Sequence, residues 1–297
     1  MRRIATRLIT AGRMTSQTAR SAFRAARLGR ESEAEKLAVT TLRREVAQLP
    51  PVDKGSIPAE AFWTAHRTQL RMDIARKDPR LFLRWPIIEG SMVVRREWIV
   101  HALPEMESIG WLPLLTEDAL GAPQRIPGTA TSSNLLQKAY QIVRFQRATG
   151  RRVADFAVTE FGAGYGAMAK VLHRLGVRSL RLYDLPEFSA LQRYYLTLLN
   201  IKAETISPPA AFPHGGTGSM LIATWSLSET PLSLRDEMQD AIMSYDAFLI
   251  GFKEQLFDID NVGYFKRLMR NMPGISWTQE QIYSLPGDHR YLFGIRE

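Results

Sequence analysis

The sequence predicts an α/β protein built on a doubly wound, seven-stranded sheet, with a parallel core, a C-terminal hairpin and an additional N-terminal helical region. Two observations carry this prediction. From residue 153 onward, short runs rich in Val, Ile, Phe and Leu alternate with amphipathic segments of helical length, which is typical of parallel strands joined by crossover helices. In addition, three glycines fall within five positions after the first apolar run, as expected for a tight turn between a strand and a helix.

The order of the elements follows from these runs. We expect strands at 154–161, 179–184, 202–207, 220–226, 247–252, 275–285 and 290–296. Helical periodicity predicts helices at 167–176, 188–200, 233–244 and 261–272. The last two strands have no helix between them, so they are predicted to form a hairpin joined at residues 286–289.

The N-terminal part of the chain is predicted to be mainly helical. Residues 31–48 form a helix that two prolines end, and a second helix begins at a Ser56 cap with Pro58 near its first turn. Residues 81–130 are mixed and irregular, whereas residues 131–150 combine a Ser/Thr start, apolar residues at helical spacing and a terminal glycine.

The composition limits the class of protein. The chain is 45% hydrophobic and 23% charged, as in soluble globular proteins with a sizeable core. It has no cysteine, which excludes disulfides and thiolate metal sites and is compatible with a reducing compartment, so we expect a cytoplasmic protein. No apolar run approaches the ~18 residues that a membrane-spanning helix needs.

The net charge of +9 comes from one segment. Residues 1–30 contain eight arginines and no acidic residue. Without these eight, 31 of the 39 basic residues remain against 30 acidic ones, so the rest of the chain is almost neutral. This basic tail could lie as an amphipathic helix on anionic lipid, resemble an organelle transit peptide, or stay solvated.

The glycine-rich turn indicates the kind of ligand. Gly162, Gly164 and Gly166 have the spacing Gly-x-Gly-x-Gly, and Ala167 stands where the third glycine of a dinucleotide-binding turn belongs. Glu160, two residues before the first glycine, adds a carboxylate at the strand end. A carboxylate suits a cationic or hydroxyl-bearing ligand better than a pyrophosphate.

Asp184 ends the second predicted strand. The carboxyl ends of parallel strands meet at one edge of the sheet, so this side chain is expected beside the glycine-rich turn. There it can accept hydrogen bonds from both ribose hydroxyls of a nucleoside. Together, the turn, Glu160 and Asp184 indicate a nucleoside ligand without phosphates.

Three stretches carry a family resemblance: "EFGAGYGAMAKVL", "LYDLPEFSALQRYYL" and "LIATWSLSETP". They resemble class I S-adenosylmethionine-dependent methyltransferases and, more narrowly, the sugar O-methyltransferase family of bacterial polysaccharide gene clusters. The resemblance covers about residues 130–297 and implies a Rossmann-like fold with S-adenosyl-L-methionine as cofactor. The chain is accordingly divided into a basic tail (1–30), a helical lid and acceptor region (31–130) and a cofactor-binding methyltransferase domain (131–297).

The same resemblance implies roles for individual residues. Glu160 and the glycines would hold the methionine part of the cofactor, Asp184 the ribose, and the end of the third strand the adenine. Phe161 is bulkier than expected before the first glycine and is expected to pack under the sheet. The implied cofactor-binding set is Glu160, Gly162, Ala163, Gly164, Tyr165, Gly166, Asp184, Leu185, Ser207, Trp225 and Ser226.

A hydroxyl acceptor needs a base, because the alcohol loses its proton as the new bond forms. In this fold the acceptor lies over the ends of the first and fourth strands, where Glu229 is a candidate base; it could instead cap the following helix. His289, near the last strand, is the alternative base, or a structural histidine. We predict no metal site, and Asp258 and Asp260 are expected to cap a helix.

The residues and the resemblance together predict an S-adenosylmethionine-dependent O-methyltransferase that acts by direct displacement, and the resemblance alone implies a sugar hydroxyl, on a glycan or a nucleotide-linked sugar, as the acceptor. Two alternatives stay open: a methyltransferase for another small molecule, and a non-catalytic nucleoside-binding scaffold whose basic tail contacts a membrane or a partner. The nearly neutral body argues against nucleic acid as a partner, as does the lack of an "NPPY"-type segment after the fourth strand. The sequence leaves open whether the chain forms a homo-oligomer.

Overall fold

The computed structural model describes residues 31–297, apart from residues 54, 56 and 57. The basic tail predicted over residues 1–30 and the Ser56 cap lie outside the described residues. Among the helices in the described part of the chain, none combines the length and the apolar character needed to cross a membrane.

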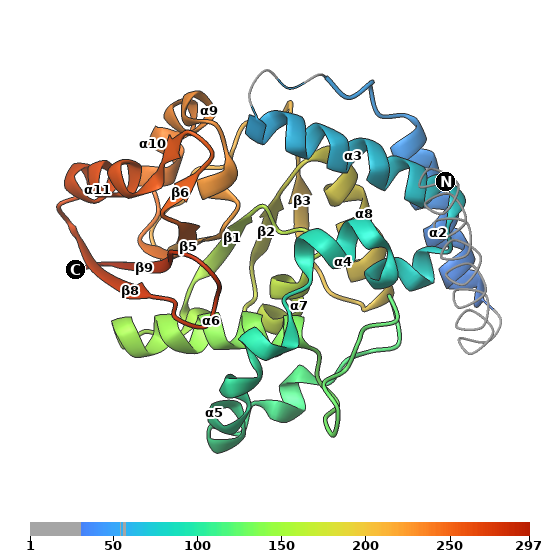
Figure 1. Cartoon of the computed structure of the whole chain (residues 1–297), viewed down its shortest axis with the longest axis horizontal. Helices are drawn as coiled ribbons and strands as arrows, with labels where there is room; N and C mark the ends of the chain where they lie inside the picture. Colours follow the sequence, from blue (N-terminus) through green and yellow to red (C-terminus); the bar gives the residue numbers. More distant parts are fainter. Residues whose placement is uncertain (1–30, 54, 56–57) are drawn as a thin grey trace, which may run out of the picture.

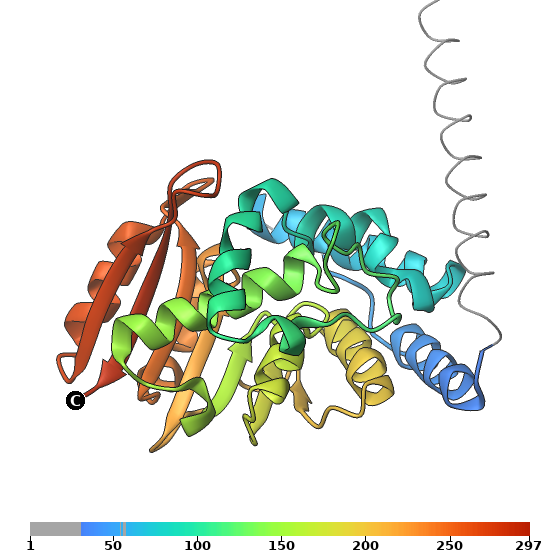
Figure 2. The same cartoon turned by 90° about the horizontal axis from the view of Figure 1, so that it is seen from below.

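A seven-stranded sheet forms the centre of the molecule (Figures 1 and 2). Its strands are β1 (Ala157–Phe161), β2 (Leu180–Tyr183), β3 (Glu204–Ile206), β4 (Ser219–Thr224), β5 (Ala247–Lys253), β8 (Ile275–Gln281) and β9 (His289–Arg296). The spatial order is β3-β2-β1-β4-β5-β9-β8, in which the first five strands are parallel and β9 is antiparallel to both of its neighbours. The predicted parallel core and C-terminal hairpin are therefore confirmed.

The other elements surround this sheet. The α-helices are α2 (Glu33–Ala47), α3 (Pro58–Arg76), α4 (Pro86–Met92), α5 (Leu103–Ser108), α6 (Ser133–Thr149), α7 (Ala167–Arg174), α8 (Pro186–Leu198), α9 (Leu232–Glu237), α10 (Gln239–Met243) and α11 (Asn261–Asn271). Short 3-10 turns include η4 (Leu112–Leu115) and η6 (Leu227–Glu229), and a small ribbon pairs β6 (Gln255–Leu256) with β7 (Ile259–Asp260).

Both faces of the sheet are buried. In β4, Met220 and Ile222 pack into the apolar layer that contains α6, α7 and α8, whereas Leu221 and Ala223 pack into the layer that contains α10 and α11. This alternation follows from the two-residue period of a strand. Helices on both faces allow parallel strands to consist almost entirely of apolar residues.

The sequence located most elements to within two or three residues. Ser132 caps α6, Gly150 ends it in the left-handed conformation, and Asp260 caps α11, all as expected. The helix predicted at 233–244 is instead two short helices, α9 and α10, which meet at Met238. Buried residues continue at helical spacing across this junction, so periodicity does not reveal the break. The strand predicted at 275–285 already ends at Gln281.

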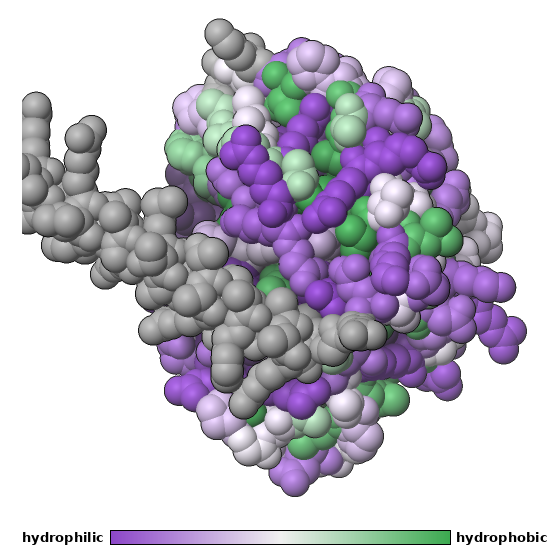
Figure 3. Space-filling model, turned by 90° about the vertical axis from the view of Figure 1, so that its right-hand side faces the viewer, coloured by the Kyte–Doolittle hydropathy of each residue, from purple (hydrophilic) through white to green (hydrophobic). Residues whose placement is uncertain are grey.

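The N-terminal helices lie over α8. Ser32 and Glu35 form a capping box at the start of α2, which buries an apolar stripe and leaves its other side to solvent. Hydrophilic residues cover much of this end of the molecule (Figure 3). A buried ion pair joins the irregular segment before α6 to helix α7. The Lys170 ammonium on α7 is 1% exposed and lies 2.7 Å from the Glu117 carboxylate and 2.9 Å from that of Asp118.

Candidate functional site

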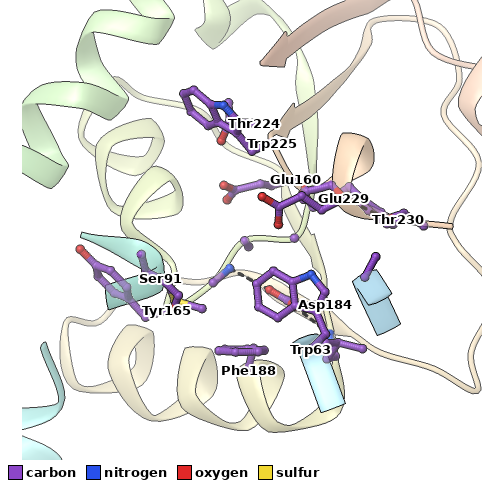
Figure 4. A pocket seen from close by; sticks show the side chains of 18 of the residues that line it. Trp63, Ser91, Glu160, Tyr165, Asp184, Phe188, Thr224, Trp225, Glu229 and Thr230 are labelled. Atoms are coloured by element: carbon purple, nitrogen blue, oxygen red, sulfur yellow. Dashed lines mark hydrogen bonds between the residues drawn. The ribbon is translucent and has the colours of Figure 1, made fainter. Parts of the chain in front are cut away.

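A cavity of about 800 Å³ opens at the carboxyl ends of β1, β2 and β4. From β1 the chain first forms β2 and β3 on one side of this strand, and then crosses over to form β4 on its other side. Doubly wound sheets bind their ligands where the strand order reverses in this way. Helix α3 and the end of α4 contribute to its walls, together with the glycine-rich turn (Figure 4). The volume is typical of small-molecule sites.

The glycine-rich turn is shaped by close packing. Gly162, Gly164 and Gly166 all have positive φ, at +70°, +59° and +96°. A Cβ atom on Gly162 would overlap the side chain of Ser226, which donates a hydrogen bond to the carbonyl of Phe161. The turn therefore brings backbone, rather than side chains, to the edge of the cavity.

Asp184 lies against this turn. Its carboxylate accepts hydrogen bonds from the backbone N–H groups of Gly164 and Leu185, both at 2.7 Å, and from the amide of Gln192 at 3.2 Å. Burial raises the pKa of Asp184 to about 7, although these three hydrogen bonds favour the ionised form. The carboxylate is thus fixed in one orientation with oxygen lone pairs left for a ligand.

Glu160 is a second buried carboxyl group at the cavity, with 2% of its surface exposed. Its Oε2 atom has no hydrogen-bond partner among the described residues. Burial raises its pKa to about 7, while the charge of Lys138 acts in the opposite direction. Lys138 comes from α6, donates a hydrogen bond to Thr224 at 3.3 Å, and has a pKa lowered by burial.

Trp225 follows β4 with a backbone φ of +68°, which is rare for a bulky residue. Two hydrogen bonds hold this conformation: its N–H donates to the Gly251 carbonyl at 2.6 Å, and its indole N–H donates to Nδ1 of His289 at 2.8 Å. Strained backbone of this kind persists where the surrounding structure fixes it, and it occurs often at functional sites.

The same hydrogen bond bears on His289 as a base. An indole N–H only donates, so Nδ1 of His289 must be the unprotonated nitrogen, and in the neutral ring Nε2 carries the proton. The ring also hydrogen-bonds the backbone of Pro286, and burial lowers the pKa of His289. His289 thus lines the cavity without a free basic nitrogen and acts as a support for Trp225.

Glu229, in η6, lines the same cavity and its carboxyl group points into it (Figure 4). It does not cap the next helix, because α9 begins at Leu232 without a side-chain cap. Burial alone raises the pKa of Glu229 to about 7. A carboxyl group with a pKa near neutrality suits a base in proton transfer.

Aromatic side chains form the walls around these carboxyl groups. The rings of Trp63 on α3 and Phe188 on α8 meet edge to face at 6.0 Å, close to Asp184 (Figure 4). Trp98 and Trp225 also line the cavity. Phe161 also lines the cavity, and its ring stacks on Tyr183 at 5.7 Å in the apolar layer that contains α10 and α11.

The structure brings most of the residues expected at the site together. Those that line the cavity are Glu160, Gly162, Ala163, Gly164, Tyr165, Asp184, Leu185, Trp225, Ser226, Glu229 and His289. Gly166 instead caps α7, and Ser207 lies outside the lining, where Pro208 takes its place. Sequence reasoning missed Met92, Asn134, Lys138, Phe188 and Thr224. Only Phe188, one turn into the helix after Asp184, could have been found from its position.

Comparison with known proteins gave no match to a protein-family model and none to a curated protein sequence. Solved structures do match. Magnesium protoporphyrin IX methyltransferase from Synechocystis PCC 6803, crystallised with bound SAM, matches with 11% identity and a TM-score of 0.41, over 69% of this chain and 99% of that one. The methyltransferase domain of bacterial CtHen1-CN matches with 9% identity and a TM-score of 0.42, over 55% and 100%. A SAM-dependent methyltransferase from Aquifex aeolicus matches with 13% identity and a TM-score of 0.37, over 48% and 83%.

Proposed function

We propose that this protein is an S-adenosylmethionine-dependent methyltransferase that transfers a methyl group to a hydroxyl group, on a sugar of a glycan or a nucleotide-linked sugar. The observation that carries the proposal is the pair of buried carboxyl groups, Glu160 and Asp184, on either side of the glycine-rich turn in one cavity. Such a pair suits a ligand with a cationic end and a ribose better than one with phosphate groups.

The residues present fit this cofactor. The unpartnered Oε2 atom of Glu160 can accept a hydrogen bond from the ammonium of the cofactor's methionine part. Lys138, which also lines the cavity, can face the carboxylate of that methionine part. Asp184, held by Gly164 and Leu185, can accept from the ribose hydroxyls. When bound, S-adenosylmethionine supplies a methyl group activated by a sulfonium.

The acceptor side of the cavity supports a hydroxyl substrate. Glu229 can take the proton of the hydroxyl as the oxygen attacks, because no described residue hydrogen-bonds its carboxyl group and its pKa lies near neutrality. Trp63, Trp98 and Trp225 offer flat apolar faces on which a sugar ring can stack.

Calorimetric titration of the full chain with S-adenosylmethionine tests the cofactor. We expect binding in the micromolar range, and Asp184→Ala should weaken it by about 10- to 100-fold, because hydrogen bonds to a charged group contribute about 1.5–3 kcal/mol. Wild-type protein without binding at high micromolar cofactor would refute the proposal.

A screen with isotope-labelled cofactor against nucleotide sugars and cell glycans, followed by mass spectrometry, tests the acceptor. Glu229→Gln should keep cofactor affinity and slow transfer by about 10²- to 10⁴-fold, the usual contribution of a general base. Glu237→Gln, at an exposed position on α9, is the matched control. Full turnover by Glu229→Gln would exclude Glu229 as the base, and labelling of another compound class alone would exclude the sugar.

A further inference from the structure

Arg235 is a fully buried arginine whose hydrogen-bond partners are all neutral. Its side chain, on α9, has 0% of its surface exposed. The guanidinium donates to the Thr230 carbonyl at 2.7 Å, the Ser228 carbonyl at 2.8 Å and the Asn261 amide oxygen at 2.8 Å. Buried arginines usually pair with a carboxylate, because an isolated charge is costly to remove from water. Burial accordingly lowers the pKa of Arg235, to about 10.

The two carbonyl groups that Arg235 binds belong to the residues on either side of Glu229. The fork of the guanidinium therefore holds the backbone just before and just after the proposed base. Two further hydrogen bonds stabilise the backbone around Glu229. The Ser228 hydroxyl donates to the Trp225 carbonyl at 2.6 Å, and the Thr230 hydroxyl donates to the Ser226 carbonyl at 2.9 Å.

Arg235 also ties this segment to the end of the sheet. Asn261, itself fully buried at the start of α11, accepts from Arg235 and donates its side-chain N–H to the Lys253 carbonyl at the end of β5, at 2.9 Å. The Tyr264 ring lies 4.6 Å from the guanidinium carbon, at a distance where a cation and an aromatic face attract. Arg235 and Asn261 thus fix the position of the segment around Glu229 relative to the sheet.

Glu229 depends on its backbone for its orientation. Among the described residues, no group hydrogen-bonds its carboxyl, and burial is the sole cause of its raised pKa. A carboxyl that has no side-chain partner can be aimed at a substrate only through the backbone that carries it. The hydrogen bonds on both sides of Glu229 fix that backbone.

We propose that Arg235 is a positioning residue that aims the carboxyl group of Glu229 into the cavity, by binding the carbonyl groups of Ser228 and Thr230. The inference rests on the proposed role of Glu229 as the base. It explains why, among the described residues, no carboxylate hydrogen-bonds this buried cation, although the charge of Asp236 acts on it: a carboxylate bound to Arg235 would take up donors that the two carbonyls need.

The proposal also explains the choice of arginine. A guanidinium has five N–H donors in a planar fork and can bind three oxygens in fixed directions. A lysine ammonium is a compact point charge on a flexible stem, so it cannot span both carbonyls and Asn261 with the same geometry. Arg235→Lys therefore keeps the positive charge and removes the paired hydrogen bonds to the Ser228 and Thr230 carbonyls.

The test measures the carboxyl group of Glu229 directly and needs no acceptor. Protein labelled with ¹³C at the glutamate carboxyl is titrated by NMR, and the resonance that is missing in Glu229→Gln identifies the residue. In the wild type its midpoint should lie near pH 7. In Arg235→Lys we expect the midpoint to fall by about one unit or more, because the carboxyl turns toward water. Cofactor affinity, measured by calorimetry, should change less than threefold, since Asp184 and the glycine-rich turn are untouched.

Arg144→Lys is the matched control, because Arg144 pairs with Glu280 at 2.8 Å and does not line the cavity. It should leave the Glu229 titration unchanged. An unchanged midpoint in folded Arg235→Lys would overturn the proposal. Loss of the fold or of cofactor binding in that variant would also overturn it, because Arg235 would then support the whole domain. A wild type that binds no cofactor would refute the proposed function, while the titration would still decide whether Arg235 positions Glu229.

Discussion

Gly162 lies where the end of β1 passes against Ser226, just beyond β4, and two separate properties of glycine are needed there. Its φ of +70° is a conformation that costs other residues about 1–2 kcal/mol. A Cβ atom would also overlap Ser226, whose hydroxyl bonds the Phe161 carbonyl. Gly176 has a similar φ of +87° with nothing within 4 Å of its Cβ position. Substitutions at these two positions can therefore separate the cost of backbone strain from the cost of steric overlap.

We expect Gly176→Ala to lower the free energy of unfolding by about 1–2 kcal/mol, the cost of the left-handed conformation alone. Gly162→Ala should lose about 1–3 kcal/mol more, because the overlap must be relieved by moving Ser226. Urea unfolding measures both, and calorimetry should show weaker cofactor binding in Gly162→Ala only. Equal losses in the two variants would contradict the role of close packing in this turn.

The residues that the sequence could predict are those at the carboxyl ends of strands. Glu160 and Asp184 were found because the carboxyl ends of parallel strands must meet at one edge, whatever else the fold contains. Asn134 and Lys138 come from helix α6, whose placement over that edge depends on tertiary packing. Its periodicity marks a helix, but it does not show which of its faces meets the cavity.

At the scale of elements, helix α3 is held to the start of α8 by an ion pair. Glu187, 0% exposed, accepts hydrogen bonds from Arg67 at 2.8 Å and Arg71 at 2.7 Å. Burial acts to raise the pKa of Glu187, but the hydrogen bonds from Arg67, from its own backbone N–H and from Arg71 outweigh it and lower that pKa. Because Glu187 is three residues after Asp184, this contact connects α3, which forms part of the cavity wall, to the segment whose Asp184 is proposed to bind ribose.

Glu187→Gln should therefore lower the free energy of unfolding by about 3–5 kcal/mol, since breaking one partner of a buried pair leaves two uncompensated arginines. Glu45→Gln is the matched control, because Glu45 also joins an N-terminal helix to α8, through Arg193 at 2.7 Å, in a pair with exposed fractions of 29% and 43%. It should cost at most about 1 kcal/mol. Similar losses in both variants, measured by urea unfolding, would show that α3 is not fixed through Glu187.

At the scale of the whole molecule, the sheet and the edge at which the cavity opens were predictable, but the arrangement of the segments that cover this edge was not. The alternation of apolar runs and amphipathic segments fixes strands, crossovers and the edge where a ligand binds. The cover includes α3, which is one long helix, and residues 79–98, where short helices and 3-10 turns interrupt any single period. The break between α9 and α10 was hidden for the opposite reason, because buried residues keep a helical spacing across it; the inward orientation of Arg235 was hidden with it. Long-range contacts, rather than local pattern, decide these features.

Three carboxyl groups in one cavity make the whole molecule sensitive to pH. Burial raises the pKa values of Glu160, Asp184 and Glu229 to about 7, above the ordinary carboxyl range. A raised pKa means that folding favours the protonated form, so this stabilisation is complete below about pH 4 and is lost as the pH rises through 7. The protein without ligand should therefore be more stable at pH 6 than at pH 8, which thermal unfolding at the two pH values can show.

Binding of a cationic cofactor should have the opposite dependence on pH, because it favours the ionised carboxyl groups. At pH 6 a carboxyl with a pKa near 7 is about one-tenth ionised, so we expect S-adenosylmethionine to bind about tenfold more weakly at pH 6 than at pH 8, with release of protons on binding. Calorimetry at both pH values, in two buffers of different ionisation enthalpy, measures the affinity and the protons together. Glu160→Gln should reduce both the pH dependence and the proton release, whereas the exposed Glu237→Gln should change neither. Equal affinities at the two pH values, without proton release, would mean that these carboxyl groups do not face the cation.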